Sequence, residues 1–423
     1  MLLEFRVKNF RSIRDEQVLS LVASVDKTLA STNVADTGLK APGRVVRAAA
    51  VYGPNASGKS NLLLALGFMR ALVAESATVI QLGQTFNVQP FRLDTKFSTQ
   101  PTEFEVTFVE EGVRYQYGFS LTPQRIVDEW LLVYRARKPQ QWFSRTLNTK
   151  SGAATYEFSS HLTGPRKLWQ DSTRPNALFL STAAQLNSEL LRPVFTWIVE
   201  KISHIPAGQS PLLEFTNKWL KDAAGKQSIR DFLLSADISI SDIVAVPRKG
   251  ISQHITFSAP GEPPKVSHVE QEMLMPQFVH ETKRGSAKFE LHDESMGTQR
   301  LYLLAGPVLE VLRNGRTLIV DELDSSLHTL LVRRLIGMFQ NLKLNPHGAQ
   351  LIFSTHDTSL LDQTLFRRDQ IWFTEKDTSQ ATRLYPLSDF SPRNKEALER
   401  GYLAGRYGAV PFFDGAEMAP VEE

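Results

Sequence analysis

The sequence predicts an α/β protein with a mixed sheet and a central parallel core, in which two parts of one domain are separated by an inserted lobe. Two short apolar runs are typical of buried parallel strands, Ala48-Ala49-Ala50-Val51-Tyr52 and Leu318-Ile319-Val320. The first run leads into a glycine-containing loop and a helical stretch, and the second ends in Asp321-Glu322. Residues 61–317 separate the loop from the second run, so we expect a large insertion between them.

The loop after the first strand predicts a nucleoside triphosphate site. It reads Gly53-Pro54-Asn55-Ala56-Ser57-Gly58-Lys59-Ser60, and the helix expected after it continues through Asn61 to about Glu75. Glycines at both ends let backbone N–H groups turn toward an anion, which the positive end of the helix dipole also faces. Lys59 would reach the β- and γ-phosphate oxygens, and the Ser60 hydroxyl would ligate Mg²⁺. We count all nine residues, Asn61 included, as nucleotide-binding, against the alternative of a chance glycine turn.

The acidic pair after the second strand predicts the catalytic chemistry. Asp321 and Glu322 fall at the carboxyl end of their strand, where open α/β sheets place ligands. Asp321 would hold Mg²⁺, usually through a water, and Glu322 would polarise the water that attacks the γ-phosphate. An Asp-Glu pair is also a common solvent-facing turn, but the phosphate-binding loop favours the catalytic interpretation.

A second anion-binding surface is predicted at Ser295-Met296-Gly297-Thr298-Gln299, before a strongly apolar helical stretch. Ser295 can cap that helix, and Gly297 lets backbone N–H groups approach an anion closely. The first loop already satisfies one triphosphate, so we expect Ser295, Gly297 and Gln299 to contact the nucleotide of another subunit. The alternative is an ordinary capped core helix.

Three more residues are candidates for the same site. Asp324 follows the acidic pair in a loop that could touch the phosphate loop of a dimer partner. His356 ends the apolar run Leu351-Ile352-Phe353, where it could hydrogen-bond the γ-phosphate and report its presence. Gln89 is a candidate for the glutamine that reaches Mg²⁺ and its water.

Composition excludes several classes of protein. The 423 residues, 42% of them apolar, are enough for two or three lobes. The absence of cysteine excludes disulfides, thiolate zinc sites and cysteine nucleophiles. No run of eighteen apolar residues is present and the N-terminus is charged, so we expect a cytoplasmic protein that has no membrane partner. The net charge of +3 does not by itself indicate a nucleic-acid partner.

The expected organisation has three parts. Residues 1–121 would form the N-terminal part of the domain, with alternating strands at its start and in a hairpin over residues 103–119. Residues 122–280 would form the inserted lobe, mixed or mainly helical, because short helical patterns such as 186–202 are mixed with β-like pieces such as 255–257. The many prolines and the lack of sustained heptads argue against a long coiled-coil arm. Residues 281–423 would complete the domain.

Taken together, these segments resemble the Walker A, signature, Walker B, D-loop and H-loop series of ABC-type ATPases. Within them the chain is most similar to the soluble SMC/RecF/OLD branch, and more closely to RloA/AbiL-like bacterial AAA-family ATPases. The closer resemblance rests on Asn176-Ala177-Leu178-Phe179-Leu180-Ser181, Arg368-Asp369-Gln370-Ile371-Trp372-Phe373 and the tail Tyr402 to Pro411. The signature departs from the common Leu-Ser-Gly-Gly form, since Glu294 stands where leucine is frequent and Met296 where glycine is.

The resemblance implies an ATPase that binds ATP and Mg²⁺, forms a homodimer or higher homo-oligomer through composite ATP sites, and uses Glu322, Lys59 and His356 in catalysis. It also implies a sensor or switch in bacterial anti-phage defence that controls a separate effector, a nuclease or toxin, with DNA or a phage protein as candidate trigger. Residues 357–423 are too few for the Toprim nuclease of OLD-type proteins, so we expect any nuclease on another chain. The alternatives are a RecF-like DNA repair or loading ATPase, and a scaffold that turns nucleotide over slowly.

Overall fold

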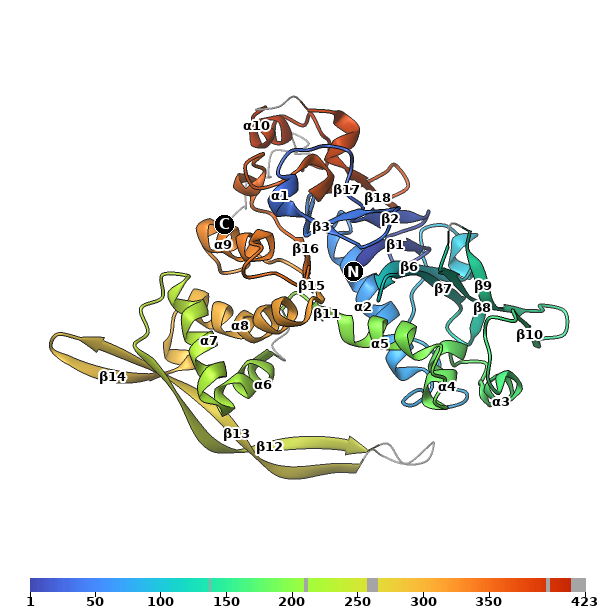
Figure 1. Cartoon of the computed structure of the whole chain (residues 1–423), viewed down its shortest axis with the longest axis horizontal. Helices are drawn as coiled ribbons and strands as arrows, with labels where there is room; N and C mark the ends of the chain where they lie inside the picture. The colour runs from blue at the N-terminus through green and yellow to red at the C-terminus, as the bar shows by residue number, and fades with distance from the viewer. Residues whose placement is uncertain (137, 209–211, 257–264, 393–395, 412–423) are drawn as a thin grey trace, which may run out of the picture. The chain divides into compact units, whose positions relative to one another are not determined.

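The chain forms two compact units, which are described separately. The structure is a computed structural model that describes residues 1–411 apart from 137, 209–211, 257–264 and 393–395 (Figure 1). Unit 1 comprises Met1–Ala207, Val311–Asp324 and Leu335–Glu423, and unit 2 comprises Gly208–Glu310 and Ser325–Arg334. Within the described residues, every helix is too short or too polar to cross a membrane.

A mainly parallel sheet lies at the centre of unit 1 and confirms the predicted α/β class. Its strand order is β11 (Ile202–Ile205), β15 (Thr317–Val320), β16 (Gln350–Ser354), β5 (Ala48–Tyr52), β17 (Ile371–Lys376) and β18 (Thr382–Pro386). All neighbours are parallel except β17 and β18. Strands β5, β15 and β16 are buried along their whole length, as their apolar runs predict. The two strands that carry the predicted motifs are therefore separated only by β16.

An antiparallel sheet forms the second layer of unit 1. Its order is β10 (Ala154–Phe158), β9 (Gln140–Leu147), β8 (Ile126–Tyr134), β7 (Val113–Leu121), β6 (Thr102–Glu110), β1 (Leu2–Lys8) and β2 (Gln17–Ser20). The expected opening strand and hairpin are present as β1 and β6–β7. Helix α2 (Lys59–Glu75) contacts β1 and β6 of this sheet and β16 of the parallel sheet, so it packs between the two layers (Figure 1).

The boundaries of the two compact units differ from the boundaries predicted from the sequence. Residues 126–158 continue the antiparallel sheet, because β8 pairs with β7 along its length and β9 and β10 follow it. Strand β11 then extends the parallel sheet beside β15. Residues 122–207, expected in the inserted lobe, thus belong to unit 1. This stretch also contains α3 (Arg166–Ser172), α4 (Phe179–Gln185) and α5 (Arg192–Lys201).

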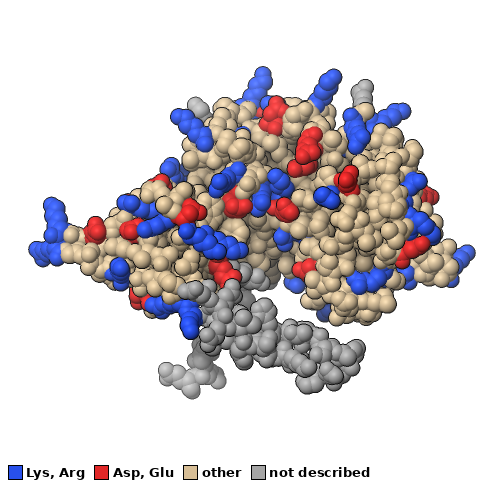
Figure 2. All heavy atoms as spheres, turned by 60° about the horizontal axis from the view of Figure 1, so that its bottom comes forward, with Lys and Arg blue, Asp and Glu red and all other residues tan. Residues whose placement is uncertain are grey.

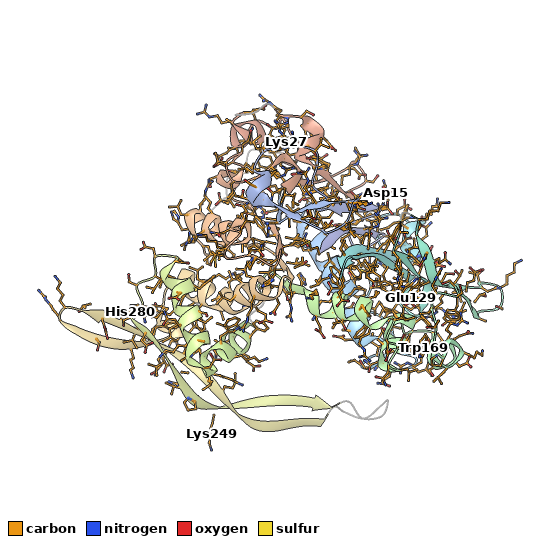
Figure 3. All side chains as sticks on the ribbon, viewed as in Figure 1. Asp15, Lys27, Glu129, Trp169, Lys249 and His280 are labelled. Atoms are coloured by element: carbon orange, nitrogen blue, oxygen red, sulfur yellow. The ribbon has the colours of Figure 1, made fainter. Side chains whose placement is uncertain are left out.

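Buried polar contacts anchor α4 to the antiparallel sheet. The Glu129 carboxylate, on β8, is completely buried and accepts hydrogen bonds from the backbone N–H groups of Phe179 and Leu180 at 2.7 and 2.9 Å (Figure 3). Burial raises the pKa of Glu129, and the nearby Arg145 guanidinium opposes that shift. Ser181 adds a hydrogen bond from its hydroxyl to the Val73 carbonyl on α2, at 2.7 Å. The segment 176–181 therefore joins the far end of α2 to the sheet.

The tail folds against the core of unit 1. Helix α10 (Leu398–Leu403) places the Tyr402 ring 6.1 Å from the Tyr52 ring and 5.5 Å from the Phe373 ring. The Tyr402 hydroxyl donates to the Ala409 carbonyl at 2.7 Å. Tyr52 ends β5 directly before the phosphate loop, so the tail supports the strand that leads into that loop.

Unit 2 is mixed, one of the two forms expected for the inserted lobe. It contains α6 (Leu212–Asn217), α7 (Ala223–Leu234), most of α8 (Met296–Asn314) and the antiparallel strands β12 (Asp242–Thr256), β13 (Lys265–Thr282) and β14 (Gly285–Glu290). Strand β13 packs on α8, where the Phe278 and Tyr302 rings are 5.2 Å apart and nearly perpendicular. The Tyr302 hydroxyl donates to Asn217 Oδ1 at 2.6 Å, which joins α6 to the same helix. Short elements complete the described chain: α1 (Ala30–Asn33), β3 (Val34–Asp36), β4 (Arg44–Val46), and α9 (Thr329–Gln340), which continues from unit 2 into unit 1.

Candidate nucleotide-binding site

The loop between β5 and α2 has a backbone conformation that requires glycine at two positions. Gly53 has φ 154° and Gly58 has φ 111°, a region that residues with side chains rarely adopt. A Cβ atom at Gly58 would lie 2.1 Å from Thr382 Oγ1, and one at Gly53 would lie 2.4 Å from the Thr374 carbonyl oxygen. The loop can therefore lie this close to β17 and β18 only with glycine at positions 53 and 58. Helix α2 begins at Lys59 after Gly58, which has no side chain to cap it, so the capping residue leaves the first N–H groups of the helix available to an anion.

Hydroxyl groups from segments distant in the sequence support the loop through hydrogen bonds. Ser57 Oγ lies 2.7 Å from Thr374 Oγ1, and Thr382 Oγ1 donates to the Ser57 carbonyl at 2.9 Å. Ser12 Oγ lies 2.8 Å from Thr382 Oγ1 and accepts from the Asn61 side-chain amide at 2.7 Å. Ser57 and Asn61, both expected at the nucleotide, thus have side chains that support the loop. The supporting residues Ser12, Thr374 and Thr382 were not predicted, because no local motif marks them.

Lys59 is held inside the loop. Its ammonium group donates to the carbonyl oxygens of Gly53 and Pro54 at 2.8 and 3.1 Å, and the residue is only 5% exposed. Burial lowers the pKa of Lys59 to about 8, although the charges of Asp321, Glu322 and Asp324 act in the opposite direction. The loop and the acidic turn, far apart in the sequence, lie close together because the strands before them, β5 and β15, are separated only by β16.

The acidic turn is held by the end of β16. Asp321, 4% exposed, follows β15, and its Oδ1 accepts from the Ser354 hydroxyl at 2.5 Å. The same Ser354 oxygen accepts from the Glu322 N–H at 2.7 Å. Asp324 Oδ2 accepts from the His356 N–H at 3.2 Å. The structure therefore brings Asp321, Glu322, Asp324 and His356 into one cluster that lies near Lys59. The contact of Asp324 with the phosphate loop of a dimer partner stays a prediction.

The residues present fit Mg²⁺ bound together with a nucleotide. Asp321 and Ser60 offer hard oxygen ligands, and Mg²⁺ is usually bound by one or two carboxylates together with substrate phosphates. In the parts of the chain that the structure describes, no group of three or more His, Cys, Asp or Glu side chains could hold a metal. Asp321 and Ser60 would therefore hold the ion with the triphosphate, while their role stays a prediction.

The surroundings of His356 favour its neutral form. Burial and the Lys59 charge lower its pKa from the ordinary value, while the carboxylates of Asp324, Glu322 and Asp321 oppose the shift. A neutral imidazole has one donor and one acceptor nitrogen, so His356 can donate to a phosphate oxygen without carrying a charge. Its predicted contact with the γ-phosphate is compatible with this placement.

The structure places Gln89 near the N-terminal end of α2. Its backbone carbonyl accepts from the Arg11 N–H at 2.7 Å, and Arg11 precedes Ser12, which bonds Asn61. Gln89 thus belongs to a segment beside the loop-supporting hydroxyls. Its predicted contact with Mg²⁺ remains a prediction.

The predicted signature segment lies in unit 2 and caps α8. Ser295 Oγ accepts from the Thr298 N–H at 3.2 Å, which confirms the predicted cap. The Gln299 side-chain amide donates to the Glu294 carbonyl at 2.8 Å, so this side chain turns back onto its own segment. Glu294 Oε1 lies 2.7 Å from His280 Nε2 on β13 (Figure 3). Ser295 itself is exposed, and its hydroxyl also lies 2.9 Å from Thr298 Oγ1. Its contact with an anion of another subunit stays a prediction.

The lowered pKa of Lys59 predicts pH-dependent ATP binding. Only the protonated amine attracts phosphate, so affinity should be nearly constant below pH ~8 and fall by up to about tenfold per pH unit above it, one proton being taken up on binding. Equilibrium binding of a fluorescent, non-hydrolysable ATP analogue between pH ~7 and ~9.5 measures this. An affinity that is flat across this range would contradict the assignment of Lys59 to the phosphates.

The profile of the family described as "AAA domain, putative AbiEii toxin, Type IV TA system" matches residues 48–362, more than half of the chain. Among solved structures, the chain is similar to an SMC head bound to the C-winged helix domain of ScpA, with 12% identity and a TM-score of 0.45, over 91% of this chain and 97% of that chain. It is also similar to the SMC head domain from Thermotoga maritima, with 13% identity and a TM-score of 0.41, over 91% and 98%. A search of curated proteins found no match.

Proposed function

Since the chain belongs to the family described as "AAA domain, putative AbiEii toxin, Type IV TA system", we propose that it is an ATP-hydrolysing switch of a bacterial defence system. The observation that supports this most is the convergence of Lys59, Asp321, Glu322 and His356 at one end of the parallel sheet, where β5, β16 and β15 lie side by side. A lysine, two carboxylates and a histidine are residue types that can bind a triphosphate and promote phosphoryl transfer to water.

Each residue has a role in the proposed reaction. The loop N–H groups and Lys59 bind the β- and γ-phosphates, and Asp321 with Ser60 would hold Mg²⁺, which neutralises phosphate charge when bound. Glu322 accepts a proton from water as the water oxygen bonds to the γ-phosphorus. The bond from that phosphorus to the bridging oxygen breaks, and ADP leaves with the electron pair. His356 donates a hydrogen bond to the γ-phosphate.

The proposed switch depends on a second copy of the chain. Ser295 is exposed at the N-terminus of α8, where backbone N–H groups and the helix dipole favour an anion. We place the γ-phosphate of a partner subunit there, so that two ATP molecules are enclosed between two chains. Closure and hydrolysis would then change the hold on a separate effector, a toxin or nuclease.

ATP-dependent association tests the composite site. Ser295→Asp and Ser295→Asn both retain a capping side chain, but only aspartate adds a negative charge facing the phosphate. With a non-hydrolysable ATP analogue, the wild type and Ser295→Asn should dimerise by mass measurement, and Ser295→Asp should need roughly tenfold more protein, about 1.4 kcal/mol. Equal association of all three would contradict the proposal, as would full ATP turnover by a protein that stays monomeric at every concentration.

The RecF-like alternative predicts duplex DNA binding. On the face drawn in Figure 2, Lys and Arg side chains are interspersed with Asp and Glu, and the chain carries a net charge of only +3. Neither observation favours a DNA partner. ATP-dependent DNA binding that weakens steeply between roughly 50 and 200 mM salt would nevertheless support DNA as partner or trigger, and its absence at low salt would exclude the alternative.

A further inference from the structure

We propose that Ser354 is a positioning residue for ATP hydrolysis, whose hydroxyl fixes the metal ligand Asp321 and the backbone of Glu322 in one arrangement. The inference rests on the proposed ATPase function. It assigns a role to a residue that contacts neither the phosphates nor the attacking water.

The hydrogen bonds of the Ser354 hydroxyl are determined by its partners. A carboxylate only accepts and a backbone N–H only donates, so the one hydroxyl proton goes to Asp321 Oδ1 at 2.5 Å. The Ser354 oxygen then accepts from the Glu322 N–H at 2.7 Å. The residue is completely buried, so water does not compete for either bond. One oxygen of Asp321 is thereby occupied, and the other is left for Mg²⁺ and its water.

Ser354 also stabilises an unusual backbone at Glu322. Glu322 has φ 53°, in the left-handed region, which is uncommon for residues with a side chain. Such a conformation persists where the surroundings fix it. Here the Glu322 N–H bonds the Ser354 hydroxyl, and the Leu323 N–H donates to the Ser354 carbonyl at 3.1 Å. The direction of the Glu322 side chain therefore depends on Ser354.

The same strand end also carries His356. Its N–H donates to Asp324 Oδ2, so four hydrogen bonds join the turn 321–324 to residues 354–356. Ser354 makes three of the four, two of them through its hydroxyl. Loss of its hydroxyl should disturb the metal ligand and the water-activating carboxylate together.

The test is Ser354→Ala, with Ser354→Thr as the variant that restores the hydroxyl. In Ser354→Ala we expect the maximal ATPase rate to fall about 10- to 100-fold and the Mg²⁺ concentration for half-maximal rate to rise several-fold, as when partners of metal ligands are removed. Binding of ATP in EDTA should change less than about twofold, because Lys59 and the loop are untouched. Ser354→Thr should recover most of the rate and of the Mg²⁺ dependence.

Ser181→Ala is the matched control for the loss of a buried hydroxyl. Ser181 is also completely buried in unit 1 and bonds one carbonyl oxygen, that of Val73. The Ser181→Ala variant should have a lower unfolding temperature but the same Mg²⁺ concentration for half-maximal ATPase rate as the wild type. The inference is overturned if Ser354→Ala keeps the rate and Mg²⁺ dependence of the wild type, if Ser354→Thr fails to restore them, or if Ser181→Ala reproduces the shift.

Failure of the proposed function would be seen separately. A wild type that turns over no ATP contradicts the ATPase assignment. In that case the Mg²⁺ dependence of binding a non-hydrolysable ATP analogue, compared among the wild type, Ser354→Ala and Ser354→Thr, still decides the role of Ser354. Identical curves for the three proteins would overturn it.

Discussion

Glu322→Gln is expected to lower the maximal rate of ATP hydrolysis by roughly 10²- to 10⁴-fold, the usual contribution of a positioned general base. Glutamine has nearly the same shape but cannot take the proton from the attacking water. Lys59 and the loop are unchanged, so ATP should still bind with an affinity close to that of the wild type. Phosphate release under saturating ATP and Mg²⁺, together with equilibrium ATP binding, measures both effects.

The same variant should accumulate the closed assembly. If two subunits enclose two ATP molecules and reopen only after hydrolysis, Glu322→Gln should remain dimeric in ATP itself, where the wild type returns to monomer as ATP is consumed. Glu111→Gln is a matched control, because Glu111 is an exposed residue in the β6–β7 turn. A Glu322→Gln protein that hydrolyses ATP as fast as the Glu111→Gln control would remove Glu322 from the proposed mechanism.

The parts of the site that the sequence predicts are those encoded locally. The loop from Gly53 to Ser60 carries its own conformational requirement in Gly53 and Gly58, and both have the positive φ that the pattern predicts. The buried strand before Asp321 is likewise readable from its apolar run. Ser295 was predicted as a cap from one residue type before an apolar helix, and its hydrogen bond is present.

The supporting residues could not be predicted, because sheet pairing brings them from distant segments. Thr374 and Thr382 lie on β17 and β18, and their hydroxyls reach Ser57 only because β17 is the parallel neighbour of β5. Ser354 faces Asp321 because β15 and β16 pair in register. A serine or threonine in a strand has no local signal that separates these roles from ordinary packing.

The boundaries of unit 2 also depend on pairing between strands that are distant in the sequence. The stretch Ile126–Tyr134 reads IVDEWLLVY, which does not alternate apolar and polar residues, so its pairing with β7 is what places it in the antiparallel sheet. Strand β11 is too short to show such an alternation, and only its pairing with β15 places it in the parallel sheet. The boundary near Ala207 therefore follows from tertiary structure.

Lys59→Ala is expected to weaken ATP binding by about 3 kcal/mol, roughly 100-fold, because it removes a charged donor to two phosphates. The remaining affinity should lose the pH dependence expected above pH ~8, since the titrating group is gone. Both effects are measured in one series of equilibrium binding curves with the fluorescent ATP analogue.

Two controls separate this effect from damage to the fold. Lys150→Ala removes an equal charge from the exposed turn between β9 and β10, and should leave binding unchanged. The unfolding temperature of Lys59→Ala should stay well above the temperature of the binding measurement, although the two hydrogen bonds to the loop carbonyls are lost. If Lys59→Ala binds the analogue as tightly as Lys150→Ala, or keeps the pH dependence of the wild type, the ammonium group that lies between Gly53 and Pro54 does not serve the phosphates.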